Sequence, residues 1–129
     1  MPAEESLYPG DWVRFAEQDV HRVYRTLEDE DAGLAGFCLQ QALEKYLKAF
    51  LLSKGWELRR IHNLEVLLED ALEYAPSWDI YRSVCVRVSA FYLFERYPYV
   101  SSSSLSLDDV RQELSTVEEL IQHVKAAIE

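Results

Sequence analysis

Residues 34–54 read LAGFCLQQALEKYLKAFLLSK, and this stretch decides the fold class. Its apolar residues fall on more than one face of a helix, whereas a surface helix carries a single apolar stripe. They are Leu34, Phe37, Cys38, Ala42, Leu43, Leu47, Phe50 and Leu51. Gly55 follows the stretch and suits a C-terminal helix cap. The sequence therefore predicts a central helix over residues 34–54 that other helices surround.

The segments on both sides of this stretch predict further helices. Apolar residues recur at steps of three and four over residues 11–28, 64–75 and 78–96. This spacing places side chains on one helical face. Pro76 and Pro98 follow two of these segments, and a proline disfavours helix in the residue before it. Each of the three segments is therefore predicted to be one helix.

A last helix is predicted at the C-terminal end of the chain. Ser106 with Asp109 three residues later resembles a capping box, and apolar residues continue at helical spacing to Ile128. The 129 residues, 49% of them hydrophobic, suit one packed interior and leave no room for a second. The sequence predicts an all-α fold, a single up-and-down bundle of about five helices, formed by one domain over residues 1–129.

The composition excludes several classes of protein. A net charge of −10 argues against broad binding to nucleic acids or anionic membranes. No uncharged apolar run approaches the roughly 18 residues of a membrane span, and the acidic N-terminus is unlike a signal peptide. A cytoplasmic protein without membrane contact is predicted. Cys38 and Cys85 lie in apolar helical surroundings without CxxC spacing, so both are expected to be buried thiols.

One part of this acidic chain is basic. Residues 41–63 carry a net charge of +3, so the rest of the chain carries −13. Lys45 and Lys48 are three residues apart and can share a helix face, next to the amides and carboxylate of Gln40, Gln41 and Glu44. The pattern fits a local anion site, but a solvated Lys/Glu face with ordinary salt bridges explains it equally well.

Two further residues are candidates for binding an anionic ligand. Arg96, between Tyr92 and Tyr97, could hold a phosphate or stack on a base, or instead cap helix carbonyls or pair with an acidic neighbour, Glu95 or Asp108. His62 lies in the basic stretch, where it could contact a ligand or hydrogen-bond locally at a helix start. The histidines are far apart in sequence and form no metal motif, so neither a metal nor a cofactor is predicted.

The order of these residues resembles a known family. The strings FCLQQALEKYLKA (residues 37–49), IHNL (residues 61–64) and ERYP (residues 95–98) look like the HEPN family, the higher eukaryote and prokaryote nucleotide-binding domain. The most specific elements are the glutamine pair followed by Glu-Lys and Lys-Ala, and the Arg-Tyr-Pro triplet. The resemblance runs over residues 11–129, essentially the whole chain.

The resemblance implies an all-α bundle that forms a homodimer, and helix 78–96 carries aromatic residues beyond what one bundle needs to bury: Trp78, Phe91, Tyr92 and Phe94. It also implies a minimal nucleotidyltransferase as partner, in many cases within a toxin–antitoxin pair. Many members are metal-independent ribonucleases that use an arginine and a nearby histidine. Arg96 occupies the arginine position here, but no histidine follows it at four to six residues.

Three hypotheses follow. The leading one is a non-catalytic, dimeric nucleotide- or RNA-binding protein that acts with a nucleotidyltransferase and binds its ligand through Lys45, Lys48, His62, Arg96 and Tyr97. The second is a metal-independent RNA endonuclease toxin in which Arg96 and His62 are catalytic. The third is a pure interaction module whose acidic surface docks a basic partner.

Overall fold

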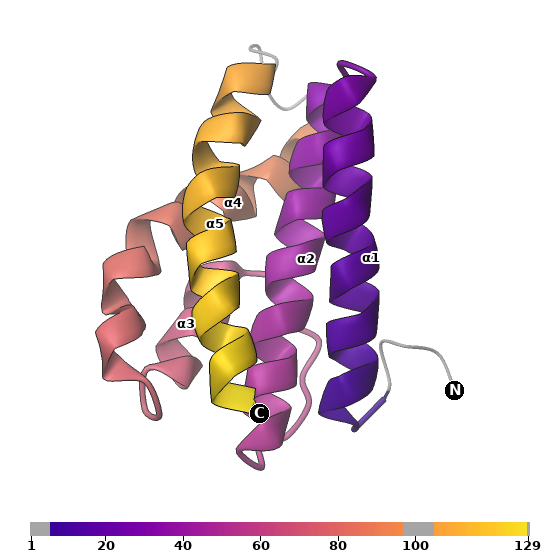
Figure 1. Ribbon diagram of the computed structural model, residues 1–129. Coiled ribbons are helices and arrows are strands. Elements are labelled where there is room, and N and C mark those ends of the chain that lie inside the picture. Colours follow the sequence, from indigo (N-terminus) through magenta and orange to yellow (C-terminus); the bar gives the residue numbers. More distant parts are fainter. Residues whose placement is uncertain (1–5, 97–104, 129) are drawn as a thin grey trace.

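The structure is a computed structural model that describes residues 6–96 and 105–128, without the side chains of residues 94–96. Within these residues it consists of helices and turns, with no strand. The order is α1 (Pro9–Glu28), α2 (Ala32–Ser53), α3 (Leu64–Ala71), the 3-10 helix η2 (Pro76–Tyr81), α4 (Arg82–Arg96) and α5 (Leu107–Ile128). The predicted all-α fold with five α-helices is confirmed (Figure 1).

Helix α2 is the centre of the bundle, as its apolar pattern predicts. It packs against α1, α3, α4 and α5, and Figure 1 shows it between α1 and α5. Fourteen of its 22 residues are buried. Because most of the surface of α2 faces other elements, its apolar residues need no single stripe. Asp31 begins the helix by accepting a hydrogen bond from the backbone N–H of Leu34.

Two cap predictions are confirmed. Gly55 has a φ of 85° after the end of α2, and the N–H groups of Gly55 and Trp56 bond to the carbonyls of Leu52 and Leu51. This is the Schellman arrangement, which favours glycine at its left-handed residue. Before α5, the Ser106 hydroxyl accepts from the Asp109 N–H, and the Asp109 carboxylate accepts from the Ser106 N–H.

The predicted boundaries around Pro76 are wrong. Helix α3 ends at Ala71 instead of residue 75, and residues 76–81 form a 3-10 helix, so α4 begins at Arg82 instead of at Trp78. Ala75 precedes the proline and has a φ of −140° and a ψ of 70°, outside the helical region. The Trp78 N–H then bonds back three residues to the Ala75 carbonyl, as in a 3-10 turn.

The core explains the two cysteines and much of the aromatic content. Cys38 and Cys85 are buried thiols, as predicted, and burial raises the pKa of the Cys85 thiol to about 12. Trp78 and Phe91 are also buried within this one chain. The sequence had suggested that aromatic residues of helix 78–96 exceed what one bundle can bury and could form a dimer surface. Trp78 and Phe91 are not available for such a surface.

None of the helices in the described ranges is long and apolar enough to cross a membrane.

Candidate functional site

A surface cavity of about 350 Å³ brings the basic stretch of the sequence together with aromatic side chains. One wall is a face of α2, and the other parts come from α1, the connection between α2 and α3, and α4. The lining residues are Trp12, Phe37, Gln41, Glu44, Lys45, Lys48, Arg59, Arg60, His62 and Tyr92. Four of these are Lys or Arg and one is a carboxylate, so the cavity is locally basic in an acidic chain.

A ladder of buried polar side chains runs along α2 beside the cavity. Gln40, Glu44 and Lys48 recur every four residues, so they stack on one side of the helix, and each is at most 4% exposed. Gln40 Nε2 and Lys48 Nζ each lie 3.0 Å from a different oxygen of the Glu44 carboxylate. Burial of this carboxylate is tolerable because donors surround it. We call these three residues the polar ladder.

His62 is attached to the polar ladder from the loop before α3. Its Nδ1 lies 3.0 Å from Glu44 Oε1, and its backbone carbonyl accepts a hydrogen bond from Gln40 Nε2. An ionised carboxylate only accepts, so Nδ1 carries the hydrogen and Nε2 is left for another partner. More than half of the His62 side chain is exposed, so the imidazole is accessible from solvent.

Aromatic rings continue from the imidazole into the bundle. The His62 ring stacks on Tyr92 with centroids 5.5 Å apart and planes at 15°, and Tyr92 in turn stacks on Phe37 at 5.7 Å. His62 and Tyr92 also line a second hollow, together with Asn63 and Ser89. The stack fixes the plane of the imidazole, which its hydrogen bond to Glu44 alone would not do.

Lys45 and Lys48 differ in burial and in ion-pair partner, although they lie only three residues apart on α2. Lys48 is buried, its ammonium pairs with Glu44, and it lies over the Trp12 ring at 5.5 Å from the centroid. Lys45 pairs with the buried Asp19 of α1, yet 18% of its side chain is exposed. Both positive charges are therefore matched by a buried carboxylate, but the side chain of Lys45 is the more exposed of the two.

Two arginines of the connection between α2 and α3 add positive charge to the cavity. Arg59 pairs with Asp70 of α3 and lies over the Trp56 ring. Its side chain is still 53% exposed, so solvent screens the pair. Arg60 lines the same cavity and has interactions of its own. The connection therefore contributes two guanidinium groups to the cavity lining.

The structure brings three of the five predicted binding residues to this cavity: Lys45, Lys48 and His62. Tyr97 and the side chain of Arg96 lie outside the described residues. The sequence alone did not assign Tyr92 or Trp12 to the site. For Trp12 the sequence held no signal beyond its place in a helix. Tyr92 could have been found, because it lies four residues before Arg96 and therefore on the same helical face.

No group of three or more His, Cys, Asp or Glu side chains that could hold a metal ion occurs in the described part of the chain. The site offers instead ammonium and guanidinium groups, one imidazole nitrogen and aromatic faces. Such a set suits an anion that also carries a flat ring.

Comparison with known proteins agrees with the fold and with the sequence resemblance. The family model described as HEPN domain matches residues 10–127. The crystal structure of ST0689, an archaeal HEPN homologue, is 25% identical, with a TM-score of 0.75 over 95% of this chain and 98% of that one. The crystal structure of TT1696 from Thermus thermophilus is 21% identical, with a TM-score of 0.83 over 92% and 97%. No curated protein matches the chain.

Proposed function

The chain belongs to the HEPN domain family, and on that premise we propose that it is a non-catalytic protein that binds a nucleotide or RNA. The observation that carries the proposal is the shared cavity. It is lined by the partly exposed side chain of Lys45, by Arg60 and by the imidazole of His62. The positive charges suit a phosphate, and the imidazole in its ring stack suits a base. One small site therefore offers partners for both the phosphate and the base of a nucleotide.

In this proposal each residue has a separate task. Lys45 and Arg60 bind phosphate oxygens, and the ring pair of His62 and Tyr92 presents an aromatic face to a base. His62 Nε2 accepts a hydrogen bond from a hydroxyl or amino group while the imidazole is neutral, and donates one to phosphate when it is protonated. Arg96 and Tyr97 belong to the proposed set through their sequence positions after Tyr92.

Lys48 was expected to contact phosphate, but we propose a positioning role for it instead. Its ammonium is already paired with Glu44, and only 4% of its side chain is exposed. Lys48 and Gln40 therefore hold the Glu44 carboxylate in place, and Glu44 in turn orients His62. In the proposal these residues are positioning residues behind the binding surface.

The binding proposal is tested by calorimetric titration of ATP, GTP and short RNAs into the full chain. We expect binding that weakens at least tenfold in Lys45→Gln and in Arg60→Gln, because each loses a charge-assisted hydrogen bond of about 1.5–3 kcal/mol. Arg111→Gln, on the exposed surface of α5, is the matched control that keeps wild-type binding. Flat titrations at millimolar ligand would refute the proposal.

We further propose that the protein works as a homodimer with a minimal nucleotidyltransferase partner, in a module of the toxin–antitoxin type. The family membership supports this part of the proposal. Sedimentation velocity at micromolar concentration tests the dimer, because a species of 15.0 kDa would be a monomer. Co-purification with the nucleotidyltransferase encoded beside it, where one exists, tests the partner.

A metal-independent RNA endonuclease is the second candidate, and the contact between His62 and Glu44 favours it. With Nδ1 held by the carboxylate, Nε2 can remove the proton of a ribose 2′-hydroxyl, whose oxygen then attacks the adjacent phosphorus. The bond from phosphorus to the 5′-oxygen breaks, and the imidazolium returns the proton to that oxygen. Arg96 is the candidate for stabilising the phosphorane charge.

This candidate is tested by cleavage of a fluorescent mixed RNA in chelator. Loss of cleavage in identically prepared Arg96→Ala and His62→Ala would establish a nuclease. Absence of cleavage by the wild-type protein leaves the binding proposal, and equal cleavage by wild type and both variants would identify a contaminant.

A further inference from the structure

The space between α1 and α5 holds another cavity, apart from the one beside His62. Its volume is about 310 Å³, and its lining residues come from α1, α2 and α5. Figure 1 shows these two outer helices on either side of α2. Among the described residues, none lines both cavities. We call this cavity the α1–α5 groove, and a ligand in it would not touch the proposed nucleotide site.

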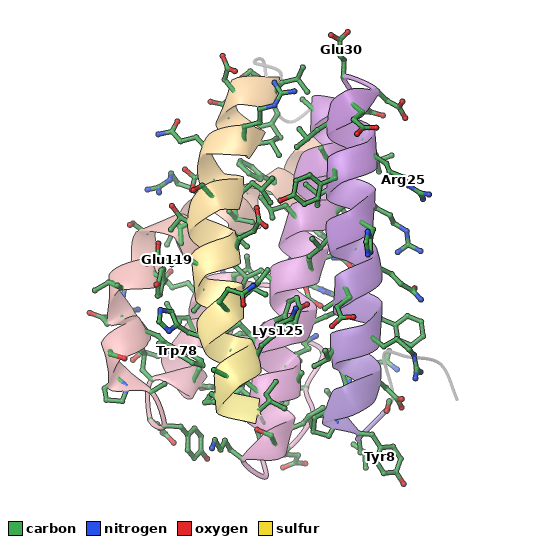
Figure 2. The ribbon with its side chains drawn as sticks, viewed as in Figure 1. Tyr8, Arg25, Glu30, Trp78, Glu119 and Lys125 are labelled. Carbon is green, nitrogen blue, oxygen red and sulfur yellow. The ribbon has the colours of Figure 1, made fainter. Side chains whose placement is uncertain are left out.

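Two side-chain contacts cross the groove from α1 to α5. Tyr24 donates a hydrogen bond to Glu118 at 2.6 Å, and Glu17 Oε1 lies 3.9 Å from Lys125 Nζ. The earlier residue of α1 meets the later residue of α5, so the two helices are antiparallel and the contacts are about two helical turns apart. Figure 2 shows Lys125 on the side of α5 that faces α2. The middle of the groove lies between these two contacts.

Tyr46 of α2 lies at the floor of the groove with an unused hydroxyl. The residue is 1% exposed, and Lys125 Nζ lies over its ring, 5.9 Å from the centroid. No group within residues 6–96 and 105–128 hydrogen-bonds to this hydroxyl. Burial, and then the charge of Glu17, raise the pKa of Tyr46 to about 12, so the hydroxyl is a donor at neutral pH. A buried donor without an acceptor is costly, and an acceptor from outside the chain is therefore expected here.

The pair of Glu17 and Lys125 is loose enough to admit a ligand between its charges. Its 3.9 Å separation is too long for a hydrogen bond, and the two side chains are 51% and 39% exposed. Such an exposed pair contributes little to stability, so separating it costs little. The groove therefore presents one cationic donor and one anionic acceptor side by side, next to the Tyr46 hydroxyl.

Apolar side chains line the middle of the groove. Val20 of α1 and the buried Ile121 of α5 both lie between the two crossing contacts. The exposed side chains of His21 and Gln122 line the same part. A volume of about 310 Å³ is at the lower end of the range for small-molecule sites. The groove therefore suits a small molecule that carries two opposite charges and an apolar part.

We propose that the α1–α5 groove binds a free α-amino acid with an apolar side chain. The ligand carboxylate accepts hydrogen bonds from Lys125 Nζ and the Tyr46 hydroxyl, and its ammonium donates to Glu17. An α-amino acid carries both charges on one carbon atom, so they are close enough together to meet this pair. An anion alone would face Glu17, and a cation alone would face Lys125. The binding goes beyond the proposed function and does not depend on it.

The test is calorimetric titration of the full chain at pH 7 with leucine, valine and methionine. Leucinamide lacks the carboxylate charge and N-acetyl-leucine lacks the ammonium charge, so each should bind at least tenfold more weakly than leucine. Lys125→Gln and Glu17→Gln should each weaken leucine binding at least tenfold for the same reason. Tyr46→Phe should weaken it about threefold to tenfold. It should not lower the midpoint of thermal unfolding, because the hydroxyl has no partner in the described part of the chain.

The controls and outcomes separate this inference from the proposed function. Arg111→Gln and Glu57→Gln each remove one exposed charge elsewhere and should keep wild-type affinity for leucine, as should Lys45→Gln in the other cavity. Flat titrations with all three amino acids at millimolar concentration would overturn the proposal. Equal binding of leucine, leucinamide and N-acetyl-leucine would also overturn it, since the paired charges would then not select a zwitterion. Neither result bears on nucleotide binding, which different residues carry.

Discussion

Two sides of helix α2 are equally buried but have different chemistry. One side contributes Leu39, Leu43 and Leu47 to the core, and another carries the polar ladder. Leu43 is 0% exposed and Glu44 is 4% exposed, so burial does not distinguish them. A buried leucine needs only a space of the right shape, whereas the buried carboxylate needs donors at fixed positions. Both sides therefore contribute to stability, but only the polar ladder also sets the geometry of the site.

The strongest test of this difference is Glu44→Gln. We expect it to lower the free energy of unfolding by about 3–5 kcal/mol, because the Lys48 ammonium stays buried without its counter-charge. Urea denaturation at pH 7 measures the change. Glu57→Gln, at an exposed position, is the matched control and should stay within about 0.5 kcal/mol of wild type. A loss below about 1 kcal/mol in Glu44→Gln would show that the buried Lys48 ammonium does not depend on the Glu44 charge.

A double substitution sharpens the same comparison. Glu44→Leu with Lys48→Met removes both charges and fills the space with apolar atoms, which is often neutral or stabilising. We expect the double variant to be more stable than Glu44→Gln. It should nevertheless bind nucleotides more weakly, because His62 loses its acceptor. A double variant with wild-type affinity would mean that Glu44 does not position His62.

On the apolar side, Leu43→Ala should cost about 2–5 kcal/mol, the range for removing a fully buried leucine side chain. Its binding affinity, measured on the folded fraction well below the unfolding midpoint, should equal that of wild type. Calorimetry in the cold, where the variant stays folded, checks this. Weakened binding would show that the two sides of α2 are mechanically coupled.

Gly36 lies near the start of α2, where the side chains of Leu105 and Phe91 approach the helix backbone closely. A Cβ there would lie 2.5 Å from Leu105 Cδ2 and 3.3 Å from Phe91 Cβ. Overpacking costs about 1–3 kcal/mol and better helix propensity returns up to about 1 kcal/mol, so Gly36→Ala should destabilise by about 1 kcal/mol. In α1, Gly10→Ala meets no atom within 4 Å and should not destabilise. The midpoint of thermal unfolding should therefore fall in Gly36→Ala and not in Gly10→Ala.

The smallest effect is expected between α1 and α5, where Tyr24 of α1 donates to Glu118 of α5 at 2.6 Å. This hydrogen bond, with some burial, raises the pKa of Tyr24 to about 12. The raised pKa means that the bond stabilises the fold below about pH 10, and that this stabilisation is lost as the pH rises toward 12. Tyr24→Phe should cost less than about 1 kcal/mol at pH 7. In an absorbance titration, the variant should lose one tyrosine that ionises near pH 12.

The sequence predicted the fold well because the signals for it are local. The spacing of apolar residues, the glycine at 55 and the Ser106–Asp109 pair each act within one or two helical turns. The region around Pro76 was mispredicted because Trp78 and Tyr81 are three residues apart, a spacing that fits both a 3-10 helix and an α-helix.

The site was predicted only in part because its contacts are long-range. The basic stretch indicated Lys45, Lys48 and His62, and all three line the cavity. Nothing in the sequence distinguishes Lys45 from Lys48, since the partner of Lys45 is Asp19, 26 residues away. The contact of Tyr92 with His62 is likewise long-range, because Tyr92 lies on α4 and His62 on the loop before α3. Only the packing of α1 and α4 against α2 decides which cation is available.

The short connection between α1 and α2 also has a consequence for the order of folding. Closing a loop of three residues costs little chain entropy, so we expect this helical hairpin to form early. The ring stack needs Tyr92, far along the chain, and must form later. An early intermediate would therefore already pair Lys45 with Asp19 before the aromatic half of the cavity exists.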